Sequence, residues 1–412
     1  MSAATTPDNL VDSRYAWMRL AAAVALSAIG GVGMWSVVVA LPTVQAEFGL
    51  ARAEASLPYT LTMIGFAIGG VMMGRLADRF GIFVPVAGGI VALALGYVAA
   101  GLAANVTQFA LAHGLLIAFA GSSAMFGPLI ADTSFWFLRR RGIAVAICAA
   151  GNYLAGTIWP PIVQHFIEQA GWRATHIGIG IACLVCMLPL ALVLRRRAPH
   201  TGASAATTAL EWATRQQRLG ISPAALQTLL IIAGVACCVA MSMPQVHIVA
   251  YCADLGYGAA RGAEMLSLML GFGIVSRLTS GWIADRIGGV ATLLLGSALQ
   301  GVALLLFIPF DGLTSLYIIA SLFGLFQGGI VPSYAIIVRE YFSPAEAGTR
   351  VGTVLMATMV GMALGGWMTG AVFDLTGSYR AAFLNGIAWN LLNVSIASWL
   401  LRRSRSMRLV AA

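Results

Sequence analysis

Two versions of one eight-residue stretch decide the fold: GRLADRFG at residues 74–81 and GWIADRIG at residues 281–288. They lie 207 residues apart, and each stands between two long apolar segments. Arg173 and Arg380 show the same separation. Phe137 and Phe342 are 205 residues apart. Three pairings at nearly one offset indicate that the chain consists of two repeated halves.

The composition excludes a soluble globular protein. Of the 412 residues, 59% are hydrophobic and 9% are charged, and the mean hydropathy is +0.87. Soluble domains carry about 25% charged residues, because a surface in contact with water needs them. The composition therefore predicts a polytopic membrane protein, with the lipid bilayer as its surroundings.

Segments of about 20 apolar residues, bounded by charges, Pro or Gly, mark the expected membrane-spanning helices. They lie at about 17–42, 55–75, 84–104, 108–131, 142–166, 173–195, 224–251, 262–284, 290–310, 315–340, 349–373 and 379–401. We expect an all-α membrane protein with twelve transmembrane helices in two pseudo-symmetric six-helix bundles. Such repeats are typical of transporters, which bind substrate between the halves near the membrane midplane.

Arginine placement predicts the topology. With the N-terminus inside, 19 arginines fall on the cytoplasmic side and 4 outside, a strong positive-inside bias. The expected parts are a cytoplasmic tail (1–16), a bundle (17–195), a cytoplasmic linker (196–222), a second bundle (223–401) and a cytoplasmic tail (402–412). The arginines stand in short clusters between apolar runs, which argues against nucleic-acid binding.

The two loop stretches resemble the signature of the major facilitator superfamily. A second region resembles the fourth-to-sixth helix region of the monocarboxylate transporters and their bacterial relatives. It comprises FWFLRRRG (135–142), Gly151-Asn152, Pro160-Pro161, FIE (166–168) and GWR (171–173). The resemblance implies the facilitator fold and secondary transport by alternating access, as a multi-pass protein of a bacterial inner membrane.

Arg277 is the strongest candidate for a substrate ligand. It stands inside an apolar run, about 12 Å of helix before Asp285. An arginine within the membrane is costly unless it meets water, an anion or carbonyl groups, and its guanidinium binds carboxylates bidentately. In the monocarboxylate transporters and the oxalate:formate antiporter, an arginine on helix 8 binds the substrate carboxylate. The alternative is a structural arginine paired with Asp285 or a neighbouring helix end.

A single embedded cation suits one carboxylate. The related transporters carry a lysine on helix 1 or helix 11, but residues 20–42 and 351–373 contain no cation. We therefore expect a small monocarboxylate, and lactate, pyruvate, a short fatty acid or an aromatic acid each fit. Proton symport is expected, with His247, which follows Pro244, as the proton-coupling candidate. The alternative is a hydrogen-bonded histidine near the periplasmic surface.

Further residues are expected to line the cavity because polar groups are costly when they face lipid. They are Asn152, Tyr153, Phe119, Ser122, Ser123, Gln327 and Tyr334. The alternative for the polar ones is hydrogen bonding between helices.

The charged residues of the loop stretches have a different expected role. By resemblance, Asp78, Arg79, Asp285 and Arg286 form contacts between helix ends that hold the cytoplasmic side closed. Asp132 is expected to join these gating residues by pairing with Arg75 or Arg139.

No enzyme motif is present: the sequence has no phosphate-binding GxxxxGK[ST], no metal-spaced His/Cys cluster and no nucleophile with a base. We therefore expect no enzyme activity, metal or cofactor. One alternative function is a proton-driven exporter of drugs or other organic solutes. Its GPxxGG-like motif is absent, because residues 151–161 are GNYLAGTIWPP. A second alternative is a non-transporting carboxylate sensor, for which no soluble signalling domain is seen.

Overall fold

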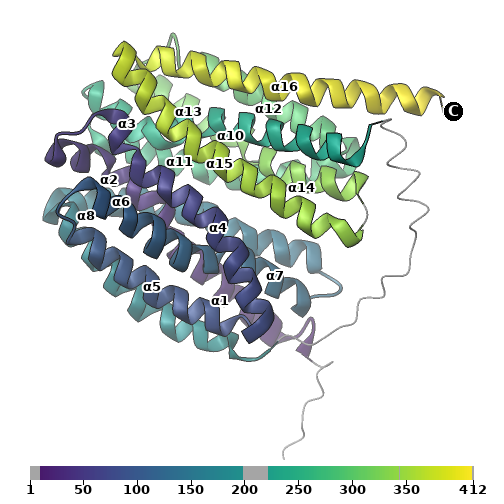
Figure 1. Ribbon diagram of the computed structural model, residues 1–412, viewed down its shortest axis with the longest axis horizontal. Coiled ribbons are helices and arrows are strands. Elements are labelled where there is room, and N and C mark those ends of the chain that lie inside the picture. Colours follow the sequence, from purple (N-terminus) through teal and green to yellow (C-terminus); the bar gives the residue numbers. More distant parts are fainter. Residues whose placement is uncertain (1–9, 198–220, 343, 411–412) are drawn as a thin grey trace, which may run out of the picture. The chain divides into compact units, whose positions relative to one another are not determined.

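The computed structural model describes residues 10–197, 221–342 and 344–410, and the regular secondary structure within these ranges is helical (Figure 1). It forms two compact units. The first consists of the described residues up to Leu50 and from Leu57 to Arg197. The second consists of Ala51–Ser56 and the described residues from Ile221 onward. Most of the predicted linker and parts of both predicted tails lie outside the described residues.

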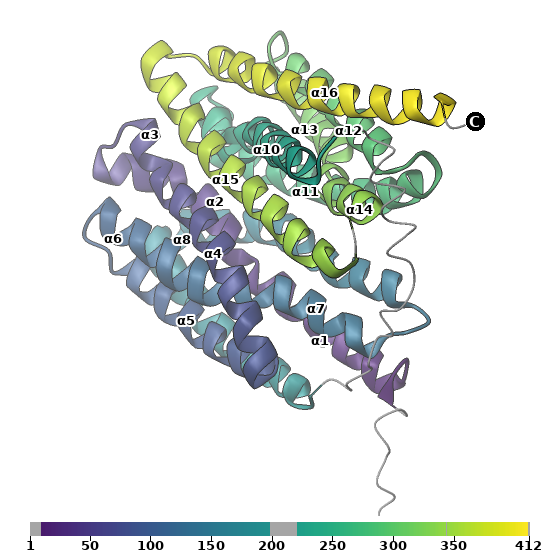
Figure 2. The same cartoon turned by 45° about the vertical axis from the view of Figure 1, so that its right-hand side comes forward.

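The first unit is built from helices that are interrupted at several points. They are α1 (Arg14–Gly30), α2 (Val32–Phe48), α4 (Leu57–Phe80), α5 (Phe83–Gly101), α6 (Val106–Leu111), the π-helix η2 (Ala112–Gly121), the 3-10 helix η3 (Ser122–Met125), α7 (Gly127–Trp136), α8 (Arg141–Leu192) and η4 (Val193–Arg195). Together α1 and α2 form one membrane crossing, and the segments from α6 to α7 form another. In Figure 2, α1 runs beside α7, with which it is in contact.

Helix α8 contains two crossings. A straight helix of its 52 residues would be about 78 Å long, far more than the roughly 30 Å of a bilayer core. Gly171 interrupts it with φ 79° and ψ 159°, a conformation that glycine adopts readily. On either side of Gly171, α8 contacts opposite parts of α1. The Trp159 indole donates to the Ala28 carbonyl, whereas the Val193 carbonyl accepts from Tyr15. The chain therefore reverses direction at Gly171.

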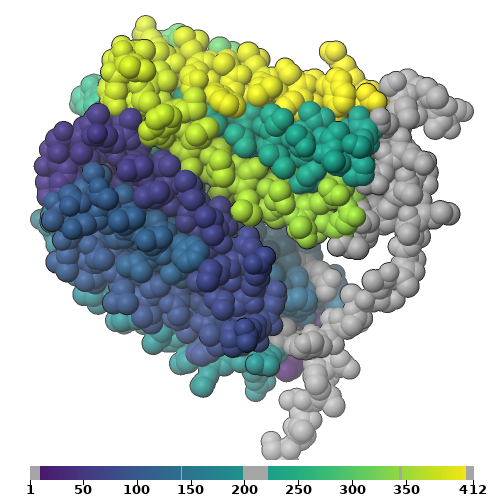
Figure 3. All heavy atoms as spheres, in the orientation of Figure 1, coloured from purple at the N-terminus to yellow at the C-terminus, as the bar shows by residue number. Residues whose placement is uncertain are grey.

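The described part of the second unit contains five long helices and three shorter ones. They are α3 (Arg52–Ala55), α10 (Pro223–Asp254), α11 (Ala259–Ile287), α12 (Gly289–Leu306), α13 (Leu313–Gln327), α14 (Ile330–Tyr341), α15 (Pro344–Thr376) and α16 (Tyr379–Val410). Helix α10 contacts both α15 and α16 and lies between them in the ribbon and in the space-filling view (Figure 3).

Ten helical stretches of the described residues are long and apolar enough to cross a membrane. Dividing α8 at Gly171 adds one crossing. Helix α16, with 32 residues, has the length of a crossing, but asparagines lower its hydropathy. Two of them donate hydrogen bonds to α12: Asn393 to the Ser297 hydroxyl at 2.7 Å and Asn390 to the Ser297 carbonyl at 3.0 Å. Because these polar groups are used inside the unit, α16 can face lipid with its apolar side. The predicted all-α membrane fold is confirmed.

The two loop stretches have the same local structure. GRLADRFG ends α4 and GWIADRIG ends α11. Gly81 and Gly288 both have φ 83°, and their N–H groups donate to the carbonyls of Ala77 and Ala284, both at 2.8 Å. This geometry is a helix C-terminus closed by a left-handed glycine. The repeat found in the sequence is therefore also a repeat in structure.

Candidate functional site

Arg277 lies in the interior part of α11, 18 residues after the helix begins and ten before it ends at Ile287. Its side chain is half-buried, and its Nε donates to the carbonyl oxygen of Gly328 at 3.5 Å. The other charged residues in the described part of the second unit lie closer to a helix end. Arg277 is thus the cation placed deepest along the helices of this unit.

The carbonyl beside Arg277 belongs to a break between two helices. Gly328 and Gly329 separate α13 from α14, and α13 packs closely against α11. A Cβ atom at Gly324 would overlap the Met269 carbonyl oxygen, and one at Gly328 would overlap that of Gly273. Small residues therefore allow the backbone of this break to approach α11. The interrupted backbone gives Arg277 a carbonyl partner that a continuous helix would not expose.

A buried pair of amides adjoins this break. Gln245 on α10 donates from Nε2 to the Oε1 atom of Gln327 at 3.0 Å, and both side chains are buried. Among the described residues, no hydrogen-bond partner is found for the Nε2 of Gln327. A buried donor without a partner costs about 1–3 kcal/mol. Such a donor next to Gly328 suits the binding of a polar group.

Tyr334 lies in a different environment from Gln327. Its hydroxyl donates to Oδ1 of Asn393 at 3.0 Å, and the side chain is fully buried. Asn393 in turn donates to Ser297, so these contacts join α14, α16 and α12. They favour the alternative of hydrogen bonding between helices for this residue.

The candidates of the first unit gather around two helix interruptions. Asn152, on α8, is half-buried and lies beside Gly31, where α1 ends and α2 begins. The Ser122 hydroxyl donates to the Gly30 carbonyl at 2.8 Å, which joins η3 to this break. Tyr153, next to Asn152 on α8, is buried. The Ser123 hydroxyl in η3 donates to the carbonyl of Phe119 in η2 at 2.6 Å, and the Phe119 side chain is half-buried.

These contacts divide the predicted lining residues into two groups, one in each unit. Arg277 and Gln327 lie at the α13–α14 break, and Asn152 and Ser122 lie at the α1–α2 break. Interrupted helices with exposed backbone groups are typical of transporter binding sites.

His247 is buried in α10. Its Nε2 atom is 2.9 Å from the Gly366 carbonyl oxygen, so this nitrogen carries the proton, whereas Nδ1 has no hydrogen-bond partner among the described residues. The Ser56 hydroxyl is 3.5 Å from Nε2. The titratable and charged groups around His247 are Arg52 on α3, Asp374 on α15 and Tyr379 on α16.

The segment Ala51–Ser56 follows α2 in sequence but belongs to the second unit. Arg52 is buried there and donates from Nη2 to Oδ2 of Asp254 at 2.7 Å. Asp374 accepts hydrogen bonds from the backbone N–H groups of Arg52 and Ala53, both at 2.8 Å. A carboxylate at a helix N-terminus satisfies donors that the helix itself leaves open. We call this segment with Asp254 and Asp374 the α3 clasp; helix α3 itself is labelled in Figure 1.

Sequence reasoning missed the α3 clasp because the partners of Arg52 are 202 and 322 residues away. One feature of the sequence could have indicated these contacts. Asp254 and Asp374 both stand at the ends of apolar segments, on the same predicted side of the membrane as Arg52.

The predicted gating residues lie where the helices end. Asp78 and Arg79 end α4, Asp285 and Arg286 end α11, and all four are exposed. Arg79 and Arg286 pack over the neighbouring rings of Phe80 and Trp282, at 5.1 and 3.3 Å. The ion pairs found among the described residues do not include these four.

The pairing predicted for Asp132 is wrong. Its carboxylate binds Arg19 instead of Arg75 or Arg139, with the Nε–Oδ2 distance at 3.0 Å and the Nη2–Oδ1 distance at 3.1 Å. Arg19 is 2% exposed and lies over the Trp136 ring. The correction follows from packing, because α1 runs beside α7 and brings the two residues together although they are 113 positions apart.

Comparisons with known proteins agree with this architecture. Monocarboxylate transporter 13 of Rattus norvegicus is 29% identical over 338 residues, which cover 80% of this chain and 75% of that protein. The MFS-type transporter YcxA of Bacillus subtilis (strain 168) is 27% identical over 356 residues, covering 82% of this chain and 83% of that protein.

One solved structure extends the comparison to the fold. A bacterial homologue of the human lysosomal transporter Spinster, in an inward-facing and unoccupied conformation, aligns with a TM-score of 0.72 at 14% identity. The alignment covers 96% of this chain and 98% of that one. The Major Facilitator Superfamily profile matches residues 23–315 and 265–410. With these matches, the repeated helix ends and the long apolar helices, the chain belongs to the Major Facilitator Superfamily and is a membrane transporter, not an enzyme.

Proposed function

We propose that this transporter moves a small monocarboxylate, such as lactate or pyruvate, by alternating access, with Arg277 as the anchor for the carboxylate. The observation that carries the proposal is the position of Arg277, a cation in the interior of α11 beside the α13–α14 break. The relatives named as monocarboxylate transporters support the substrate class.

The charge of Arg277 gives a reason for coupling movement to loading. A guanidinium stays protonated in proteins, so its charge cannot be removed by titration. Enclosing a positive charge in a medium of low dielectric constant carries a free-energy penalty, which a bound carboxylate reduces. The carrier loaded with substrate is therefore expected to close around the site more readily than the empty carrier.

The charge count favours one carboxylate over two. Residues 20–42 and 351–373 contain no second cation. Arg19, which lies just before the first of these stretches, already binds Asp132. A dicarboxylate would bring a second negative charge for which these segments supply no partner.

The test is uptake of labelled lactate into proteoliposomes under an inward proton gradient. The comparison includes wild type, Arg277→Ala and Arg277→Lys. Truncating one partner of a buried, hydrogen-bonded charge pair weakens binding by about 2–5 kcal/mol. Arg277→Ala is therefore expected to lower lactate uptake on the order of a hundredfold. Arg277→Lys keeps the charge but loses the bidentate geometry, and should retain partial uptake.

The matched control is Arg261→Ala, on the same helix. Arg261 is exposed and pairs with Glu264 at the surface, so its removal should leave uptake near the wild-type level. Full uptake by Arg277→Ala would exclude Arg277 as the anchor. Absence of wild-type uptake across a panel of aliphatic and aromatic monocarboxylates would reject the substrate class.

We propose further that a proton moves with the substrate and that His247 accepts it at Nδ1. The argument is the buried Nδ1 atom, which has no hydrogen-bond partner among the described residues and belongs to an imidazole, a ring that can accept a proton at one nitrogen while the other stays hydrogen-bonded. His247→Gln is expected to remove the dependence of uptake on the proton gradient while lactate counterflow persists. His165→Gln, an exposed histidine on α8, is the control. Gradient-driven uptake by His247→Gln equal to that of wild type would contradict the assignment.

We propose the bacterial inner membrane as the location, with both termini in the cytoplasm. The distribution of arginines supports this orientation, because positive residues are retained on the cytoplasmic side. A C-terminal fusion to green fluorescent protein should fluoresce, and a C-terminal alkaline phosphatase fusion should be inactive. The reverse pattern would overturn the orientation.

A further inference from the structure

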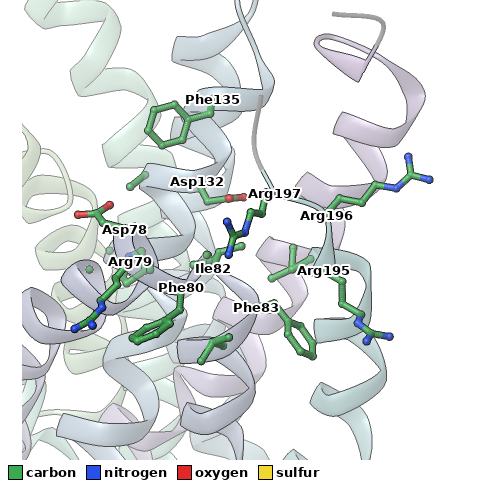
Figure 4. A pocket seen from close by; sticks show the side chains of 18 of the residues that line it. Asp78, Arg79, Phe80, Ile82, Phe83, Asp132, Phe135, Arg195, Arg196 and Arg197 are labelled. Atoms are coloured by element: carbon green, nitrogen blue, oxygen red, sulfur yellow. The ribbon is translucent and has the colours of Figure 1, made fainter. Parts of the chain in front are cut away.

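A cavity of about 620 Å³ opens at one end of the first unit (Figure 4). It is lined by the end of α4, the start of α5, part of α7 and the residues that follow α8. Its charged lining residues are Asp78, Arg79, Asp132, Arg195, Arg196 and Arg197. In Figure 4, Arg197 lies between Asp132 and Phe83, whereas Arg79, Arg195 and Arg196 extend outward around it. The rim and the interior of the cavity therefore both carry positive charge.

This positive charge is not balanced by the aspartates of the cavity. Four arginines face two aspartates, and Asp132 is already bound to Arg19. Within the part of the chain that the structure describes, none of the four arginines has a carboxylate within ion-pair distance. Clustered arginines of this kind attract phosphate groups, which they bind through several N–H donors.

Aromatic rings hold these arginines near the cavity. The guanidinium carbon of Arg195 lies 5.6 Å from the centroid of Phe83, and that of Arg79 lies 5.1 Å from the centroid of Phe80. Arg196 lies 5.2 Å from the ring of Tyr15. These cation–π contacts orient the guanidinium groups without neutralising them.

Apolar side chains form the rest of the lining and continue along α5. Phe80, Val84 and Phe135 line the cavity and are 44%, 50% and 46% exposed. From Val84, the exposed positions Gly88, Val91 and Leu95 follow at intervals of four, three and four residues. This spacing places them on one face of the helix. An apolar stripe therefore leads from the basic cavity along the surface of α5.

We propose that this cavity binds the headgroup of an anionic phospholipid, with the arginines on the phosphate and the acyl chains along the α5 stripe. Basic pockets between transmembrane helices bind anionic headgroups in this way. The combination of charge and apolar surface favours a lipid over a free phosphate ion, which would gain nothing from the stripe. This site is separate from Arg277 and does not depend on the substrate that is carried.

The test is native mass spectrometry of the full-length protein in detergent with three probes. They are phosphatidylglycerol, phosphatidylcholine with the same acyl chains, and glycerophosphoglycerol, which has the anionic headgroup without chains. The variant is Arg195→Gln/Arg196→Gln/Arg197→Gln. The control is Arg402→Gln/Arg403→Gln/Arg405→Gln, which removes the same charge from the C-terminal part of α16.

We expect wild type to bind phosphatidylglycerol more tightly than the other two probes. A basic residue near an anionic headgroup contributes about a fivefold change in affinity, so the triple variant should bind on the order of a hundredfold more weakly. The α16 control should retain wild-type affinity. If the triple variant does not fold, Arg197→Gln alone should show a loss of about fivefold.

Three results would overturn the proposal. Equal binding of phosphatidylglycerol and phosphatidylcholine would show that the headgroup charge is not recognised. Equal loss in both triple variants would show a general effect of charge. Glycerophosphoglycerol binding as tightly as the lipid would assign the cavity to a soluble phosphate compound instead.

Discussion

Arg19 of the first unit and Arg277 of the second both lie within apolar helices, but their surroundings differ. Arg19 is 2% exposed and contacts both oxygens of Asp132, the Val193 carbonyl and the Trp136 ring. Arg277 is half-buried, with its Nε 3.5 Å from the carbonyl oxygen of Gly328. The first arginine is neutralised by a carboxylate of the protein, and the second lies beside the backbone of a helix break.

The two arginines illustrate how a membrane protein uses the same residue in two ways. A carboxylate supplied by the fold makes the arginine part of the structure, because separating the pair would leave a buried charge. For Arg277 we propose that the substrate supplies the carboxylate. Substitutions that break the Arg19 pair should therefore lower the stability of the protein, whereas substitutions of Arg277 should lower transport.

The largest effect is expected from breaking the pair in the first unit. Asp132→Ala leaves Arg19 buried without its carboxylate and should lower the free energy of unfolding by about 3–5 kcal/mol. The double variant Arg19→Met/Asp132→Leu removes both charges and should recover most of that loss. Thermal unfolding in detergent, followed by tryptophan fluorescence, measures both. A double variant as unstable as the single one would show that the pair is not the cause.

A smaller loss of stability is expected when Gly328 is enlarged. The added Cβ of Gly328→Ala would lie 2.8 Å from the Cβ of Ser276 and overlap the Gly273 carbonyl oxygen, so α13 must move away from α11. Overpacking of this kind costs about 1–3 kcal/mol, and the carbonyl beside Arg277 shifts with it. Lower stability together with lower lactate uptake is expected. Gly352→Ala is the control, because its Cβ meets no atom within 4 Å.

Arg277→Met should change stability least of these variants, by less than about 1 kcal/mol. The side chain is half-buried, and removing its charge also removes a desolvation penalty. The same unfolding measurement serves for comparison with Asp132→Ala. A loss of stability as large as that of Asp132→Ala would identify Arg277 as a structural arginine and would remove the contrast between the two units.

Arg52 is an intermediate case between Arg19 and Arg277, because it is buried but its partner Asp254 is 39% exposed. Asp374→Ala removes the acceptor of two backbone N–H groups and should loosen the α3 clasp. Ser56→Cys, at a fully buried position, reports the loosening. The exposed Cys186 is first replaced by serine, so that it does not react with the maleimide. Labelling at position 56 should then be several-fold faster with Asp374→Ala than without it. The control is Glu346→Ala, which removes the surface partner of Arg350 and should leave the labelling rate unchanged. The same labelling rate in all variants would show that Asp374 does not hold the α3 clasp in place.

The helices, their pseudo-repeat and the position of Arg277 within a helix could all be predicted from the sequence. These features are local: apolar runs of bilayer length, glycines that end helices, and one charge inside an apolar segment. The left-handed glycines at Gly81 and Gly288 are examples, because the backbone conformation that they adopt depends on residues within one turn.

Which side chains are in contact could not be predicted from the sequence and depends on how the helices pack. The pairing of Asp132 with Arg19 joins residues 113 positions apart, and the α3 clasp joins residues separated by 202 and 322 positions. Such contacts depend on which helices pack together and on the rotation of each helix about its axis, which local hydropathy does not specify. The Tyr334–Asn393 hydrogen bond has the same origin, since a tyrosine that could line a cavity is placed between three helices by their packing.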